Sequence, residues 1–160
     1  MRTKSPRIVT SALLLPADQV PGAARVRRDD ATSREDHELA VQQVLAQERT
    51  LGRNPVAQPP GTAGYNVLST GVDGEVVRIL VRAQPHDPLQ TVVSYNEILM
   101  ARNATPRYRL ALVARGEAGA RVGEVRYVAE PFAQVDLRDY ESAFIRGDWN
   151  RLWEMGRAPF

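Results

Sequence analysis

The sequence contains no cysteine, and this absence excludes disulfide bonds, thiol catalysis and cysteine-based zinc or iron–sulfur sites. Histidine is nearly as scarce. The two histidines, His37 and His86, are far apart in the sequence, so we expect no metal site built from histidine. No stretch approaches the ~20 apolar residues that a membrane-spanning helix needs. We therefore expect a cytoplasmic protein without a membrane partner.

A strong charge of either sign is also missing. The 160 residues include 21 Lys and Arg against 19 Asp and Glu, which gives a formal net charge of +2. That excess is too small to indicate a dedicated nucleic-acid or membrane binder from bulk charge alone. Lys4 is the only lysine, so arginine supplies nearly all of the positive charge, and its forked guanidinium suits carboxylates and phosphates.

Residues 1–30 are predicted to form an N-terminal lead with one strand and a linker. Basic residues precede the apolar run at 8–15, as in a signal peptide, but the run is short and stops at Pro16, which favours a β-strand. Residues 31–160 are predicted to form one α/β domain with an aromatic-rich helix near its C-terminal end. A content of 43% hydrophobic residues is typical of such a globular core.

A helix is predicted at 31–52, because apolar side chains recur at helical spacing between Val41 and Leu45 and Gly52 can end the helix. Glu48 falls on the same apolar stripe. A carboxylate on the inner face of a helix needs a partner, since burying it alone is costly. Glu48 therefore either pairs with an arginine of the sheet or belongs to a functional site.

The rest of the chain alternates strands with helices. Residues 53–63 are rich in proline and glycine and are predicted to form a loop. The predicted strands lie at 64–68 and 75–82, which form a hairpin, and at 89–93, 108–113 and 124–128. Ser94 and Glu97 form a capping box for a helix at 94–103, and a last helix lies between Asp148 and Gly156. This order predicts an α+β (α/β-like) fold with a central mixed β-sheet flanked by helices.

Side chains alternate along the second hairpin strand, so they fall on two faces of the sheet. One face holds Val77, Ile79 and Val81, and the other holds Val76, Arg78, Leu80 and Arg82. The aromatic residues near the C-terminal end are predicted to lock the last helix to the core rather than to form a binding platform.

Several short strings occur in an order and spacing that resemble a known family. These strings are ERTLG (48–52), GYNVLS (64–69), RILVR (78–82), NEILMARN (96–103), YRLALV (108–113) and VRYVAEPF (125–132). Over about residues 31–135 the chain resembles the protein NO VEIN C-terminal domain family. Similar domains are appended to Swi/Snf-type helicases in bacteria, some of them in anti-phage defence loci. The family is similar to a branch of the PD-(D/E)xK nucleases, so the resemblance implies a nuclease-like core.

In that superfamily an Asp on the first hairpin strand and a Glu on the next strand hold a divalent metal, and a Lys two residues further on faces the same pocket. The corresponding positions here are Asn66, Leu80 and Arg82, and the resemblance leaves only the helix residue Glu48 as an acid. Leu80 cannot bind a metal, and Arg82 can hold a phosphate but cannot shuttle a proton. No catalytic residue, metal or cofactor is therefore expected at these degenerate positions. Instead, we expect Glu48 and Arg82 to form a salt bridge.

The leading functional hypothesis is a catalytically degenerate nuclease-fold module. It acts as a nucleic-acid-binding or accessory domain of a helicase or anti-phage defence system. Its candidate contacts to duplex DNA, which we expect to be weak, are Arg82, Arg78 and Arg53. The first alternative is a protein–protein interaction scaffold that does not bind DNA. The second alternative is a magnesium-dependent nuclease that uses displaced ligands, with candidates Glu48, Asp73, Glu75 and Asp87.

Overall fold

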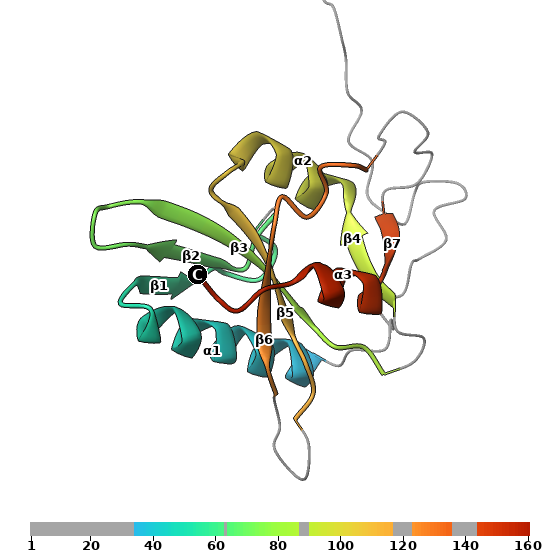
Figure 1. The fold of residues 1–160 in the computed structure, drawn as a ribbon, viewed down its shortest axis with the longest axis horizontal. Helices are drawn as coiled ribbons and strands as arrows, with labels where there is room; N and C mark the ends of the chain where they lie inside the picture. The colour runs from blue at the N-terminus through green and yellow to red at the C-terminus, as the bar shows by residue number, and fades with distance from the viewer. Residues whose placement is uncertain (1–33, 63, 87–89, 117–122, 136–143) are drawn as a thin grey trace, which may run out of the picture.

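A computed structural model of the chain describes residues 34–62, 64–86, 90–116, 123–135 and 144–160. It contains a five-stranded mixed sheet, a separate two-stranded sheet and three helices (Figure 1). The elements in chain order are α1 (Arg34–Thr50), β1 (Asn54–Ala57), β2 (Val67–Thr70), β3 (Val76–Ala83), β4 (Gln90–Ser94), α2 (Tyr95–Ala104), β5 (Tyr108–Val113), β6 (Val125–Ala129), β7 (Phe144–Asp148) and α3 (Trp149–Met155). The predicted fold class is confirmed. The predicted strand at 8–15 and the boundary at residue 30 lie outside the described residues.

The main sheet has the strand order β1-β2-β3-β5-β6, and the small sheet pairs β4 with β7. β3 and β5 pair in parallel, whereas β1–β2, β2–β3 and β5–β6 are antiparallel. A parallel pair needs a crossover connection, and here β4 and α2 supply it. The hairpin β2–β3 and the strands β4, β5 and β6 agree with the sequence prediction within a few residues.

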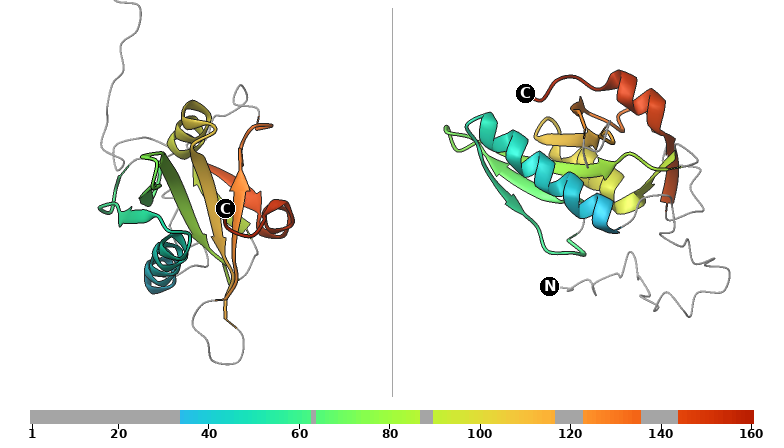
Figure 2. Two further views of the ribbon diagram at one scale, coloured as in Figure 1. Left: turned by 60° about the vertical axis from the view of Figure 1, so that its left-hand side comes forward. Right: turned by 90° about the horizontal axis from the view of Figure 1, so that it is seen from below.

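Alternation along β3 separates two apolar cores, as predicted. Val77, Ile79 and Val81 pack in the core under α1, together with Val44 of that helix. Leu80 points the other way, into a second core beneath α2 and α3. α1 and α3 consequently lie on opposite sides of the sheet (Figure 2). The face of the sheet that a residue occupies therefore decides which helix it can contact.

Two strands were not predicted. The predicted loop at 53–63 contains β1, an edge strand in which only Pro55 is buried. Its single buried residue gives no apolar alternation, and a proline is tolerated because an edge strand can leave one N–H position unpaired. β7 was also missed, and it pairs with β4 outside the main sheet. The loop prediction was therefore wrong at 54–57.

The aromatic residues after β7 anchor α3, as predicted. Trp149 is 2% exposed and stacks on Trp153, with ring centroids 5.9 Å apart. The Asp148 side chain accepts a hydrogen bond from the backbone N–H of Arg151 and caps the helix. Residues 156–160, which we call the closing segment, then run to β6, where the backbone groups of Arg157 and Tyr127 exchange hydrogen bonds of 2.8 and 2.9 Å. The segment thereby passes from the α3 side of the sheet to its edge.

Candidate functional site

Asn66 stands at the position of the expected Asp, immediately before β2. Its Oδ1 accepts a hydrogen bond of 2.7 Å from the backbone N–H of Val81, and its own backbone N–H donates to the carbonyl of Ile79 at 2.9 Å. The Asn66 Nδ2 lies 3.5 Å from His37 Nε2 on α1. The amide oxygen of Asn66 therefore helps to hold β3 in place.

Gly64, two residues before Asn66, packs closely against α2. Gly64 has a φ of +90°, and a Cβ built on it would lie 2.6 Å from the Cβ of Met100 on α2, so a larger residue does not fit there. The Tyr108 hydroxyl donates to the Gly64 carbonyl at 2.7 Å. Burial, followed by the negative charge of Glu97, raises the pKa of Tyr108, so the hydroxyl stays protonated as a donor.

Leu80 and Arg82 occupy the positions of the expected Glu and Lys on β3. The Leu80 side chain is fully buried in the core beneath α2. Arg82 forms a salt bridge of 2.6 Å with Glu97, and its other donors reach the carbonyls of Val92 and Val81 at 3.1 and 3.0 Å. Both charged side chains are 18% exposed. Arg82 therefore joins the sheet to the start of α2.

Glu97 also completes the predicted capping box. Its Oε2 accepts a hydrogen bond from the backbone N–H of Ser94 at 2.8 Å, and the Ser94 hydroxyl accepts one from the backbone N–H of Glu97 at 3.2 Å. The same carboxylate thus binds Arg82 and caps a helix. Because these contacts use the charge and donors of Arg82, they leave it little freedom to bind a phosphate.

The expected salt bridge between Glu48 and Arg82 is wrong. Glu48 lies on the inner face of α1, on the opposite side of the sheet from Arg82. It is fully buried and accepts a hydrogen bond of 2.7 Å from the Tyr127 hydroxyl. Its charge is balanced by Arg53, whose Nη1 is 3.2 Å from Glu48 Oε2. The physical reason is strand alternation: α1 covers the face that holds Val81, so Arg82 points away from this helix.

The structure adds three residues to the surroundings of Glu48 that the sequence analysis did not select: Tyr127, Arg109 and Phe160. The Arg109 guanidinium lies 4.6 Å from the centroid of the Phe160 ring, and this ring meets Tyr127 edge-on at 6.3 Å. Arg53 also donates to the main-chain oxygen of Phe160 at 3.0 Å. We call Glu48, Arg53, Arg109, Tyr127 and Phe160 the Glu48 cluster. Alternation on β5 and β6 is the sequence signal that could have placed Arg109 and Tyr127 on one face.

Electrostatics differ among the members of the Glu48 cluster. Burial, followed by the hydrogen bond to Glu48 and its charge, raises the pKa of Tyr127, so its hydroxyl remains a donor. Burial, followed by the positive charge of Arg53, lowers the pKa of Arg109. Arg53 thus has a carboxylate at ion-pair distance, whereas Arg109 has none among the described residues.

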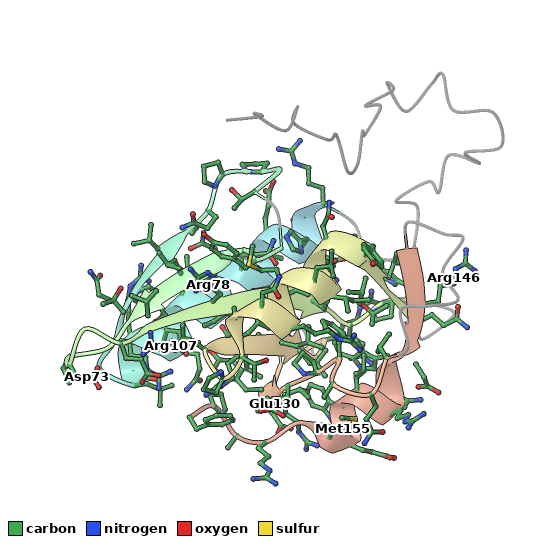
Figure 3. The ribbon with its side chains drawn as sticks, turned by 90° about the horizontal axis from the view of Figure 1, so that it is seen from above. Asp73, Arg78, Arg107, Glu130, Arg146 and Met155 are labelled. Atoms are coloured by element: carbon green, nitrogen blue, oxygen red, sulfur yellow. The ribbon has the colours of Figure 1, made fainter. Side chains whose placement is uncertain are left out.

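The third arginine proposed to contact DNA lies on the same face as Arg82. The Arg78 guanidinium is 5.8 Å from the centroid of the Tyr65 ring, and its backbone N–H donates to the carbonyl of Arg107 at 2.9 Å. Figure 3 shows Arg78 and Arg107 at the same end of the molecule. The structure therefore brings Arg78 and Arg82 onto one face and places Arg53 on the other.

Magnesium, which the nuclease resemblance implies, does not fit the residues present. Asn66 offers one neutral oxygen that is already bonded to the backbone, and Leu80 offers none. Asp73 accepts a hydrogen bond from the backbone N–H of Glu75 in the exposed hairpin turn, and Asp87 lies outside the described residues. Across the described ranges, no three His, Asp or Glu side chains come together as a metal-binding group. The alternative of a nuclease with displaced ligands therefore has no assembled metal site among the described residues.

The chain forms an α+β domain, as the sheet order, the α2 crossover and the helix α1 show. Its residues at positions 66, 80 and 82 are Asn, Leu and Arg. The chain belongs to the family of the protein NO VEIN C-terminal domain, whose model matches residues 37–128. The family predicted from the sequence is thus confirmed. No helix in the described part of the chain is long and apolar enough to span a membrane.

Two solved structures are similar to the chain. One is Hjc, a Holliday junction resolvase from the archaeal hyperthermophile Archaeoglobus fulgidus, with a TM-score of 0.49 and 10% identity over 76% of this chain and 90% of that chain. The other is a bacterial homing endonuclease, with a TM-score of 0.39 and 13% identity over 72% of this chain and 75% of that chain. No curated protein matches the sequence.

Proposed function

We propose that this chain is a non-cleaving member of the NO VEIN C-terminal family that binds nucleic acid as an accessory domain. The observation that carries the proposal is the use of the three former metal and base positions. The Asn66 oxygen binds a backbone N–H, Leu80 is buried in the core, and Arg82 is paired with Glu97. Each position has a structural role, so none is available to activate water for phosphodiester hydrolysis.

The proposed nucleic-acid contact is the surface formed by Tyr65, Arg78 and Arg107. Arg107 is exposed, and Arg78 and Tyr65 are partly exposed, at the end of the sheet where β3 and β5 begin. Guanidinium groups neutralise phosphates, and an aromatic ring offers a base a stacking surface. Because the donors of Arg82 are engaged within the protein, the proposal gives it the task of positioning α2 instead of a phosphate contact.

The accessory role rests on the resemblance to domains appended to Swi/Snf-type helicases. A domain that binds duplex DNA weakly and without sequence preference can keep a helicase near its substrate, because tethering raises the effective concentration. We propose such a helicase or another defence protein as the partner, with the cytoplasm as the place of action. A pull-down with a Swi/Snf-type helicase from the same genome should retain both proteins after DNase treatment, and loss of the complex would contradict direct contact.

The first experiment tests cleavage. Incubation with supercoiled plasmid and single-stranded DNA, in magnesium or manganese, should leave both substrates intact, because Asn66 and Leu80 stand where the metal-binding carboxylates are expected. The matched sample is Asn66→Ala, which removes the oxygen at the former Asp position. Cleavage by the wild type that is lost in Asn66→Ala would overturn the non-cleaving assignment.

The second experiment tests binding by fluorescence anisotropy of a labelled duplex across a salt series. We expect a dissociation constant on the order of 10⁻⁴ to 10⁻⁶ M at physiological salt, and a log–log salt slope of about −0.9 per phosphate contact. Arg78→Ala and Arg107→Ala should each flatten the slope by roughly one contact. Arg146→Ala is the matched control, because this exposed arginine lies toward the other end of the molecule (Figure 3). Absence of binding at low salt would favour the protein-interaction scaffold.

A further inference from the structure

Of the two arginines in the Glu48 cluster, only Arg53 lies within ion-pair distance of a carboxylate side chain among the described residues. Arg53 and Arg109 are close enough for the charge of one to lower the pKa of the other, and Glu48 is fully buried against Arg53 and Tyr127. Glu75, Glu48 and Glu130 favour the charged form of Arg109 from a distance, yet none lies within ion-pair distance of it. Arg109 is therefore a guanidinium without an ion-pair partner among the described residues.

The donors of Arg109 show where an anion would bind. Its Nη1 donates to the carbonyls of Pro106 and Tyr108, whereas its Nε is buried without a partner. No hydrogen bond of Nη2 is found either among the described residues. The edge of a guanidinium that carries Nε and Nη2 is the edge that binds a phosphate or carboxylate through two parallel hydrogen bonds. A buried donor without a partner is unfavourable, and a bound anion would satisfy it.

Phe160 covers this arrangement from the closing segment. Its ring lies over the flat face of Arg109, and its main-chain oxygen accepts from Arg53. A ring over the flat face of a guanidinium supplies no hydrogen-bond acceptor to the in-plane Nε–H and Nη2–H groups. Phe160 is 42% exposed, and the closing segment is held to β6 chiefly by the backbone pair of Arg157 and Tyr127. The cover is thus partial and rests on a few contacts.

We propose that Arg53 and Arg109 form a phosphate-binding site on the α1 side of the sheet, with Phe160 as a displaceable cover. A phosphate group would take the Nε–Nη2 edge of Arg109 and share the Arg53 guanidinium that now binds Phe160. The site lies on the opposite face from Arg78 and does not depend on the duplex-DNA contact proposed above. The group can belong to pyrophosphate or to a nucleic-acid strand, since both present the same oxygens.

The test follows the Arg109 Nε–Hε resonance by ¹⁵N-edited NMR during titration with pyrophosphate. In the wild type we expect a weak, saturable shift of that resonance. Phe160→Ala should bind pyrophosphate about tenfold more tightly, since it removes a cation–π contact and the packing that orders the cover. Sulfate in a parallel titration reports whether any tetrahedral anion suffices. An unchanged Arg109 resonance in both proteins would overturn the proposal.

Arg109→Gln in the Phe160→Ala background should abolish tight pyrophosphate binding, measured by calorimetry, while Arg78→Ala in the same background should leave it intact. Arg109→Gln keeps the partners of Glu48, so we expect it to fold, and Arg109→Lys is a second variant that retains the charge but loses the fork. If the Arg109→Gln and Arg109→Lys variants bind pyrophosphate as tightly as the Phe160→Ala parent does, the proposed site is wrong. A 5′-phosphorylated oligonucleotide that competes with pyrophosphate, when its unphosphorylated form does not, would identify a strand end as the source. Failure of both oligonucleotides to compete would assign the site to free pyrophosphate-like ligands.

Discussion

The two faces of the central sheet each hold an arginine–glutamate pair, and the pairs differ in what surrounds them. Glu48 and Arg53 belong to the α1 face, where the carboxylate is fully buried and Tyr127 is its other hydrogen-bond donor. Glu97 and Arg82 belong to the α2 face, where both side chains retain some exposure and the carboxylate also caps a helix. Removing one partner of a buried ion pair lowers the stability of a protein more than removing one partner of a pair that water can still reach.

The largest expected loss of stability follows from removing the buried carboxylate of Glu48. Glu48→Ala leaves Arg53 and Tyr127 without their shared acceptor inside the α1 core, so the free energy of unfolding should fall by about 3–5 kcal/mol. Urea denaturation followed by circular dichroism measures it. Glu48→Gln is the matched control: it keeps an acceptor for Tyr127 and should lose less. A loss below about 1 kcal/mol for Glu48→Ala would mean that the cluster does not behave as a buried pair.

Glu97→Ala should have the next largest effect. It removes the charged partner of Arg82 and the second half of the capping box together, and we expect a loss of about 2 kcal/mol. The same urea titration applies. Glu97→Gln should recover part of the loss, because an amide oxygen can still accept from the Ser94 backbone. If Glu97→Ala lowers the free energy of unfolding as much as Glu48→Ala, burial does not explain a difference between the two pairs.

Tyr127→Phe separates the hydrogen bond from the packing within the Glu48 cluster. The ring stays in the core, but Glu48 loses a donor at 2.7 Å, so the free energy of unfolding should fall by about 1.5 kcal/mol. A double-mutant cycle with Glu48→Gln gives the coupling directly. Strictly additive losses in that cycle would show that the hydroxyl and the carboxylate act independently.

Alkaline pH adds a test of the same hydroxyl. The pKa of Tyr127 is raised from 10.0, so above about pH 10 the unfolded chain loses a proton that the folded protein keeps. The unfolded state then binds fewer protons, and stability falls as pH rises, by up to about 1.4 kcal/mol per pH unit for each such tyrosine. Tyr108 behaves in the same direction. Tyr127→Phe should remove the contribution of one tyrosine to the slope of stability against pH. An unchanged slope would contradict the raised pKa of Tyr127.

The smallest effect is expected at the exposed pair of Arg34 and Glu38 on α1. Their side chains are 86% and 63% exposed, and the ion pair spans one helical turn. Glu38→Ala should change the free energy of unfolding by at most about 0.5 kcal/mol. This variant is the surface reference for the two interior pairs. A loss comparable to that of Glu97→Ala would show that exposure does not weaken the pair as expected.

Sequence patterns predicted the strands that carry apolar alternation and missed those that do not. β3 was predicted within one residue at each end and β5 without error, whereas β1, whose only buried residue is Pro55, was taken for a loop. The assignment of faces along β3 was also correct. Alternation says which side chains share a face, but not which helix covers that face. The pairing of Glu48 with Arg82 failed for that reason, while the true partner, Arg53, lies only five residues along the chain.

The parallel pairing of β3 with β5 has a consequence for the order of folding. α1, β1, β2 and β3 are consecutive and contact one another through nearby parts of the sequence, so they can assemble early. β5 reaches β3 only after β4 and α2 have crossed over the sheet, and closing that longer loop must precede the pairing. We therefore expect backbone amides of β1 and β2 to gain hydrogen-exchange protection before those of β5 and β6 during refolding.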